Sequence, residues 1–237
     1  TVTVVNNIGS GTGGLDEFLI DNANNIRIGG SITANRVAIT DFSGDDIRFV
    51  GGIEGNTGVN NGYAKFSITD TVSNAYDLAF TGSTNKFGGD TANDLTFANT
   101  GSLTIGKASG ASFDFKGAIT GTAADAVNLG GTIETGGAVD LGSSTAPISL
   151  LGDTTLTTSS ADGAVTLRNS VDLDADATSA GLTFNTGTGA VTIEGAVGQR
   201  GALSQFLVNQ SSGSGTATIG TATQVGSITA TTIGLAG

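Results

Sequence analysis

The tripeptide Gly-Ala-Val recurs at an interval of 26 residues, and this repeat constrains the fold more than any other feature of the 237-residue chain. Its copies begin at Gly137, Gly163 and Gly189. A fixed repeat of about 20–50 residues is typical of arrays in which each unit packs against the next. One such unit buries too little apolar surface to offset the entropy lost on ordering its backbone. The units must therefore share a core.

Five rows can be aligned at this spacing, and each has apolar or small side chains at three positions. The rows begin at Ala111, Gly137, Gly163, Gly189 and Gly215; position three holds Phe113, Val139, Val165, Val191 and Ala217, position five holds Phe115, Leu141, Leu167, Ile193 and Ile219, and position nine holds Ile119, Thr145, Val171, Val197 and Thr223. A second apolar pair follows in most rows: Val127/Leu129, Leu182/Phe184, Phe206/Val208 and Ile233/Leu235. Positions three and five alternate with polar residues, so they point to the same side of a strand. We expect each column to form a parallel ladder, with Gly at a corner where φ is positive or backbones approach closely.

The N-terminal half is less regular. "NNIRIGGSI" from Asn24 and "DDIRFVGGI" from Asp45 are 21 residues apart, whereas "YDLAF" from Tyr76 and "NDLTF" from Asn93 are 17 apart. The segment "LDEFLI", residues 15–20, is the one helix candidate. We therefore divide the chain into irregular coils over residues 1–110 and regular 26-residue coils over residues 111–237 of the same solenoid.

These patterns predict an all-β fold, a parallel β-solenoid of about ten coils, with a right-handed β-helix as the preferred form. The 39 glycines indicate many turns, and the apolar share of 38% argues against disorder. An antiparallel β-sandwich also has short strands and many turns. It has no reason, however, to repeat the same columns through five rows.

Composition excludes several classes of function. With no His and no Cys, imidazole and thiol chemistry are absent. A net charge of −12 with only nine basic residues argues against nucleic-acid binding and against anionic membrane surfaces. The longest apolar runs are about five residues, too short for a membrane-spanning helix. Because the chain has no Met, we expect a mature fragment or a piece of a longer protein.

The rows "GAVTLRNSVDLDADATSAGLTFNTGTGAVTIEGAV" resemble the repeats of filamentous-haemagglutinin-like large bacterial exoproteins. The resemblance covers residues 111–237 well and the N-terminal half loosely. It implies a long β-helical shaft, an extracellular or bacterial cell-surface location, and an adhesive or matrix role. The Asn-Pro-Asn motif of the secretion domain of such proteins is absent, as expected for a shaft segment or a separate subunit.

Three acidic residues are the candidate metal ligands. In "VDLDADAT", Asp172, Asp174 and Asp176 alternate, so on a strand they would project from one face and offer oxygen ligands to Ca²⁺. The alternative is a solvated outer face, with Val171 and Leu173 pointing inward. An EF-hand is excluded, because its sixth and twelfth positions are Ala177 and Thr183 rather than Gly and Glu.

A second segment, "GGDTANDLTF" from Gly88, resembles a calcium-binding nonapeptide. Its pattern departs from that repeat at Thr91 and Asn93, and no tandem copy follows. No cofactor is therefore expected, and Ca²⁺ is the one alternative.

No catalytic or cofactor-binding residue is predicted. Asp45 and Asp46 beside Arg48 suggest polysaccharide chemistry, but neighbouring strand residues face opposite sides and cannot form a carboxylate pair. The eleven Phe residues indicate a core, and Trp is absent. The 21-residue spacings of Lys65, Lys86 and Lys107, and of Arg27 and Arg48, are interpreted as chance rather than as charged columns.

The sequence thus predicts a non-enzymatic structural protein, either a filament, sheath or matrix subunit or a shaft segment of a large exoprotein. The expected partner is a second copy, stacked head to tail through the N-terminal strand Thr1–Ile8 and the C-terminal coil, because neither end carries a capping sequence. No nucleic-acid partner and no membrane insertion are expected. The alternative is an adhesin module that binds glycans or other cell-surface molecules.

Overall fold

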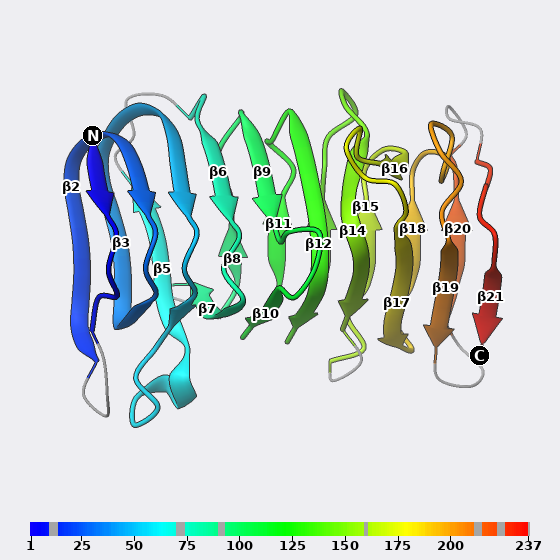
Figure 1. Ribbon diagram of the computed structural model, residues 1–237. Helices are drawn as coiled ribbons and strands as arrows, with labels where there is room; N and C mark the ends of the chain where they lie inside the picture. The colour runs from blue at the N-terminus through cyan, green and yellow to red at the C-terminus, as the bar shows by residue number, and fades with distance from the viewer. Residues whose placement is uncertain are drawn as a thin grey trace.

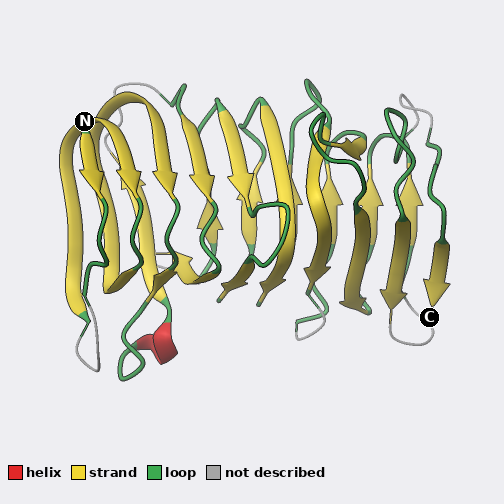
Figure 2. Ribbon diagram, viewed as in Figure 1, coloured by secondary structure: helices red, strands yellow, loops and turns green. Residues whose placement is uncertain are grey.

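A computed structural model describes residues 1–9, 14–69, 74–89, 93–158, 161–210, 215–221 and 226–236. The strands are β1 (Val2–Val4), β2 (Leu15–Ile28), β3 (Ile32–Phe49), β4 (Ile53–Glu54), β5 (Ala64–Thr69), β6 (Asp77–Phe80), β7 (Thr84–Gly89), β8 (Leu95–Thr96), β9 (Ser102–Ile105), β10 (Ser112–Phe115), β11 (Ile119–Gly121), β12 (Ala126–Thr135), β13 (Val139–Leu141), β14 (Ile148–Thr157), β15 (Val165–Leu167), β16 (Val171–Leu173), β17 (Gly181–Gly187), β18 (Val191–Ile193), β19 (Gln205–Gln210), β20 (Ala217–Ile219) and β21 (Ile233–Ala236). One short 3-10 helix, η1 (Asn60–Gly62), lies on a loop that protrudes from the stack (Figure 2).

The chain winds into a rod of about nine turns, with its first and last residues at opposite ends (Figure 1). Every strand pairing within the described residues is parallel, and the strands form one 15-stranded and one 6-stranded sheet. The predicted all-β parallel solenoid is therefore confirmed, and an antiparallel sandwich is excluded. Both halves of the chain contribute to the 15-stranded sheet, which is continuous across residue 110.

Each turn passes through three sides of the rod, and each side is a ladder of apolar residues in register. Ladder 1 runs through Val2, Ile26, Ile47, Leu78, Leu103, Val127, Ile148, Val171, Val197 and Ile228. Ladder 2 runs through Ile8, Ile32, Ile53, Asn85, Phe113, Ile133, Leu156, Phe184, Val208 and Leu235. Ladder 3 is the 6-stranded sheet, through Leu95, Ile119, Val139, Val165, Val191 and Ala217.

The predicted columns are right from Val139 onward and wrong below it. Val139, Val165, Val191 and Ala217 do stack, as do Leu141, Leu167, Ile193 and Ile219. Phe113, predicted below Val139, lies instead in ladder 2, and Ile119 takes its place. The 26-residue step belongs to ladder 3 alone, because the loops of the other two ladders vary in length.

The remaining sequence columns divide in the same way. Val171 pairs with Val197 as predicted, but its partner on the other side is Ile148 rather than Thr145; Thr223 lies outside the described residues. The pairs Leu182/Phe184, Phe206/Val208 and Ile233/Leu235 are in register, whereas Val127/Leu129 belongs to ladder 1.

In the N-terminal half, the 21-residue spacing is confirmed and the 17-residue spacing is not. Ile26 pairs with Ile47, and Ile28 with Phe49. "YDLAF" lies in ladder 1, whereas "NDLTF" enters ladder 3 at Leu95. The helix predicted at residues 15–20 is wrong, because this segment is the first part of β2 and pairs with β3.

Stacked glycines allow the backbone to pass its neighbour closely at the corner before ladder 3. A Cβ on Gly163 would lie 2.5 Å from the carbonyl oxygen of Gly137, and one on Gly189 would lie 2.3 Å from that of Gly163. Close approach, not positive φ, is thus the reason for Gly at the start of each repeat. Three threonines that are fully buried support this corner, since each donates a hydrogen bond to one of these glycine carbonyls: Thr135 to Gly137 (2.7 Å), Thr158 to Gly163 (2.5 Å) and Thr186 to Gly189 (2.9 Å).

Asp and Asn side chains link successive coils. The carboxylates of Asp77, Asp94 and Asp162 accept hydrogen bonds from the backbone N–H groups of Ser102 (2.7 Å), Ala118 (2.8 Å) and Thr188 (2.7 Å), each one coil further along the chain. Asn7 does the same for Ser31 at 2.9 Å. These bonds satisfy donors at the corners, where the ladders are interrupted. Much of the acidic excess is therefore structural.

The core contains nearly all of the aromatic residues. Ten of the eleven Phe side chains are buried, and Phe18 is partly buried, which confirms the prediction of a Phe core. Phe80 lies near the centre of this cluster, with ring centroids 5.3 Å from Phe49, 5.2 Å from Phe66 and 5.2 Å from Phe87.

Candidate functional site

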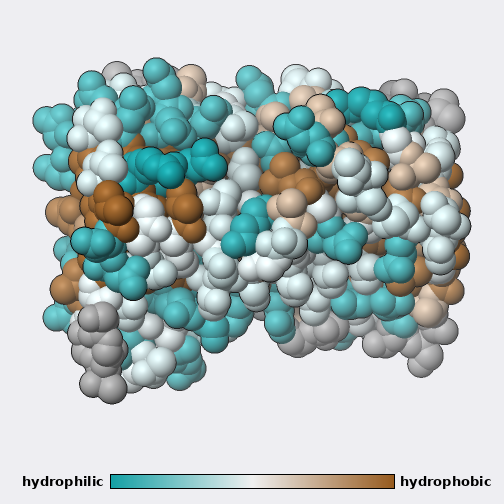
Figure 3. Space-filling model, in the orientation of Figure 1, coloured by the Kyte–Doolittle hydropathy of each residue, from teal (hydrophilic) through white to brown (hydrophobic). Residues whose placement is uncertain are grey.

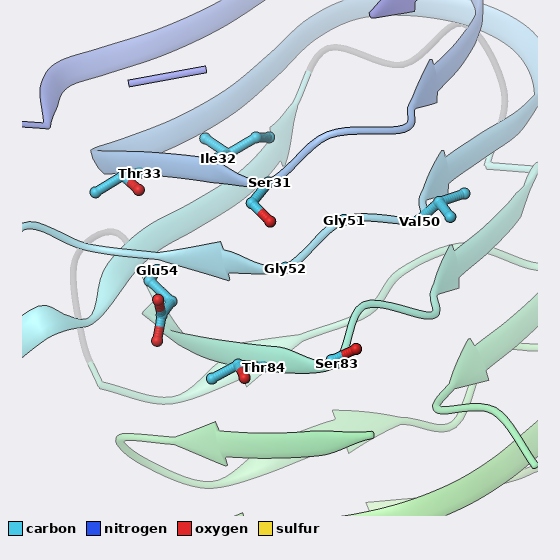
Figure 4. Close-up of a pocket in the computed structure, with 9 residues that line it drawn as sticks. All are labelled: Ser31, Ile32, Thr33, Val50, Gly51, Gly52, Glu54, Ser83 and Thr84. Carbon is cyan, nitrogen blue, oxygen red and sulfur yellow. The ribbon is translucent and has the colours of Figure 1, made fainter. Parts of the chain in front are cut away.

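The best-defined hollow in the described surface lies on the outer side of ladder 2, over Gly52 (Figure 4). We call it the Gly52 hollow; its volume is about 240 Å³, and its lining is Ser31, Ile32, Thr33, Val50, Gly51, Gly52, Glu54, Ser83 and Thr84. These residues come from three successive coils. The hollow is thus a product of coil stacking and not of one loop.

The hollow exists because Gly52 has no side chain. Ile32 pairs with Ile53, and Ile53 with Asn85, so Gly52 lies between Ser31 and Thr84 in an outward row. A Cβ on Gly52 would lie 2.1 Å from the carbonyl oxygen of Thr84. Gly is required for this close approach, and the missing side chain leaves a gap in the outer row.

Oxygen atoms dominate the chemistry of the Gly52 hollow. Glu54 is half-buried and supplies the one carboxylate, and in Figure 4 the side chains of Ser31, Thr33 and Thr84 surround the same stretch of strand. Lys107 donates a hydrogen bond to Ser83 Oγ at 3.1 Å, so a cation lies beside the lining. Hydroxyl groups both donate and accept, whereas the carboxylate only accepts. The set is suited to a polar, uncharged molecule.

A second hollow of similar size, about 220 Å³, lies over Gly181 on the same side of the rod. Its polar groups are largely paired within the protein. Asp153 accepts a hydrogen bond from the backbone N–H of Gly181 at 2.7 Å, and the Gln205 amide donates one to Thr183 Oγ1 at 3.2 Å. The two hollows share size and position but differ in the free capacity of their side chains.

The predicted acidic triad is not assembled. β16 ends at Leu173, and the chain turns before Asp176, so the three carboxylates do not share one face. Asp172 is only 2% exposed, which also contradicts the solvated outer face that was the alternative. Its carboxylate accepts a hydrogen bond from the backbone N–H of Arg200 at 2.9 Å, while Asp174 accepts one from that of Asp176 at 3.0 Å. No cluster of three or more potential metal ligands occurs in the described part of the chain.

The other candidates are scattered over the surface. Asp45 and Asp46 are both exposed, and both of their backbone N–H groups point to the side-chain oxygen of Asn25. Arg27 and Arg48 are in register, whereas Lys65 pairs with Gly88 and Lys86 with Asp114, so the three lysines form no column. Part of the segment from Gly88, including Thr91, lies outside the described residues.

Tyr63 connects the protruding loop to the rod. Its hydroxyl donates a hydrogen bond to Asp114 Oδ1 at 2.8 Å, and Lys116 Nζ lies 5.9 Å from its ring centroid. Desolvation, followed by the bond to Asp114, raises the pKa of Tyr63 to about 12. Burial alone raises the pKa of Tyr76 to about 12. The chain has only these two tyrosines and no Trp.

Alkaline titration is expected to report this difference directly. Folding raises both tyrosine pKa values above 10, so the unfolded chain ionises first and the free energy of unfolding falls from pH 10 to about pH 12. Below pH 10 these groups have no effect. Tyrosinate absorbance should rise near pH 12 in the folded protein and near pH 10 in denaturant, and Tyr63→Phe should remove half of the change. A native transition centred at pH 10 would contradict the structure.

Comparison with models of known families, with curated proteins and with solved structures found no match. The fold itself is a parallel β-solenoid and is consistent with β-helical repeat proteins. No helix in the described residues has the length and apolar character of a membrane span.

Sequence reasoning missed the Gly52 hollow. Its signal was the pair Gly51-Gly52, preceded one coil earlier by Ser31 and followed one coil later by Ser83-Thr84. The steps are 21 and 32 residues, because the loop around η1 lengthens the second coil. Without the register of ladder 2, these residues cannot be recognised as neighbours.

Proposed function

We propose that this protein is a non-enzymatic structural element of an extracellular surface, in which the solenoid continues end to end as a filament, sheath or shaft. The observation that carries the proposal is the state of the two end coils. At the N-terminal end, Leu15 and Leu19 of β2 are 40% and 50% exposed; at the C-terminal end, Ile233 and Leu235 of β21 are 51% and 69% exposed. Figure 3 displays apolar atoms at both ends of the rod.

The end strands lack the features that normally block pairing. Exposed strand edges are usually protected by charges, Pro or bulges. No Asp, Glu, Lys or Arg follows Arg200 in the sequence, so the last coils are uncharged. The first coil presents Asp16, Glu17 and Asp21, which meet no like charge in a head-to-tail contact but would repel each other in a head-to-head contact.

Ladder geometry supports continuation by strand addition. In a head-to-tail stack, β1 of one copy extends the ladder that reaches Ile228 in the other, and Ile8 follows β21. Such a contact is heterologous and does not close, so it propagates. The same edges are equally suited to further coils of one longer chain. The extracellular, bacterial assignment rests on the resemblance to filamentous-haemagglutinin-like repeats.

Assembly should depend on the end strands. The wild-type chain is expected to form rods of increasing length with concentration, detected by sedimentation velocity and by electron microscopy. Leu235→Lys, which places a charge on an exposed end residue, and deletion of residues 1–6 are each expected to abolish elongation. Val59→Lys is the matched control, because Val59 is 43% exposed on the lateral loop.

The result separates the two forms of the proposal. A wild-type chain that remains monomeric at all concentrations would contradict stacking of separate copies and leave the continuous shaft. Normal rods from the residue 1–6 deletion would rule out strand addition through β1. Elongation lost in Val59→Lys as well would indicate lateral association instead.

A further inference from the structure

We propose that the Gly52 hollow is a binding site for a neutral sugar residue of about hexose size. This role is independent of end-to-end assembly, because the hollow lies on the side of the rod and not on an end coil. The argument depends on the free hydrogen-bonding capacity of the lining, its volume and its charges.

The side-chain oxygens of the Gly52 hollow are not used within the protein. Among the described residues, no hydrogen bond involves the hydroxyls of Ser31, Thr33 or Thr84 or the carboxylate of Glu54. In the Gly181 hollow, by contrast, Asp153 is occupied by a backbone N–H. The Gly52 hollow therefore presents four unpaired polar side chains around one concave surface.

Its size and charge select the ligand class. A volume of about 240 Å³ accommodates one pyranose ring but not an extended chain. Glu54 can accept two sugar hydroxyl protons, while the Ser and Thr hydroxyls both donate and accept, which matches a polyol. The Glu54 carboxylate disfavours uronates and other anions, and the nearby Lys107 disfavours amino sugars.

Affinity is expected to be low for a single sugar. The lining contains no aromatic ring, so stacking contributes nothing, and the hollow is open to solvent. We expect a Kd in about the millimolar range, held by hydrogen bonds alone.

Ligand-observed NMR can test the proposal on the whole chain. Saturation-transfer difference spectra with glucose, galactose and mannose should show binding of at least one neutral hexose, with glucuronate and glucosamine weaker. Glu54→Gln and Thr84→Val should each weaken binding about tenfold, because a hydrogen bond to a charged or polar partner is lost. Both residues are outward-facing, so circular dichroism should report an unchanged fold.

The Gly181 hollow provides the matched control. Asp153→Asn removes the same charge from a hollow of similar size and is expected to leave hexose binding unchanged. The proposal is overturned if no neutral hexose gives a saturation-transfer signal, or if the signal persists in both Glu54→Gln and Thr84→Val. It is also overturned if glucosamine binds more tightly than every neutral hexose, because the hollow would then be a cation site.

Discussion

Replacing Gly163 with Ala is expected to destabilise the solenoid by about 2 kcal/mol or more, although it adds a single methyl group. The added Cβ would lie 2.5 Å from the Gly137 carbonyl oxygen and 2.9 Å from the Ala138 nitrogen. Both are backbone atoms held in the ladder, so neither can move without separating two coils. The same carbonyl of Gly137 accepts the Thr135 hydroxyl, and that bond would be strained as well.

Gly58 is the matched control for this substitution. Its φ, like that of Gly163, is not positive, so Ala is compatible with the backbone at both positions. Around Gly58 the one atom within 4 Å of an added Cβ is Asn56 Oδ1, at 3.8 Å. Gly58→Ala should change the free energy of unfolding by no more than about 0.5 kcal/mol. Chemical denaturation of both variants measures the difference, and equal effects would show that coil spacing does not require Gly.

Architecture could be predicted from the sequence because stacking repeats the same physical demand on every turn. Val139, Val165 and Val191 occupy equivalent positions, and ladder 3 has short strands joined by paths of equal total length. Ladder 1 steps by 21, 23 and 26 residues between Val127, Ile148, Val171 and Val197, so no fixed window can align it. Register in the other two ladders is set by loops, and loop length carries no periodic signal.

The corners explain the errors in the N-terminal half. Asn22 and Asp41 adopt φ of 53° and 49° and bend β2 and β3 from one side of the rod to the next without ending the strand. Asn and Asp tolerate this conformation better than other non-glycine residues. Their side chains are polar, so the sequence there resembles a loop. Six polar or charged residues in a row of fourteen cannot be distinguished from a helix surface by pattern alone.

The acidic residues show most clearly what sequence could not provide. Asp172, Asp174 and Asp176 alternate like ligands on a strand, but Asp172 is buried by the following coil and bonded to the Arg200 N–H. Its partner is 28 residues away and could be located only once the register of Val171 and Val197 was known. The same holds for the Gly52 hollow, whose lining comes from three coils.

The largest loss of stability is expected from Phe80→Ala. Phe80 is fully buried, stacks on Phe49 with an interplanar angle of 4°, and contacts Phe66 and Phe87 edge-on or tilted. Removing the ring should cost about 3–5 kcal/mol, because neighbours fixed by parallel ladders cannot close the cavity. In a stacked array this loss falls on the nearest coils, so hydrogen exchange should accelerate in β3, β6 and β9 before β18 and β19. Phe80→Leu should lose less, and uniform acceleration along the rod would show that the solenoid unfolds as one unit.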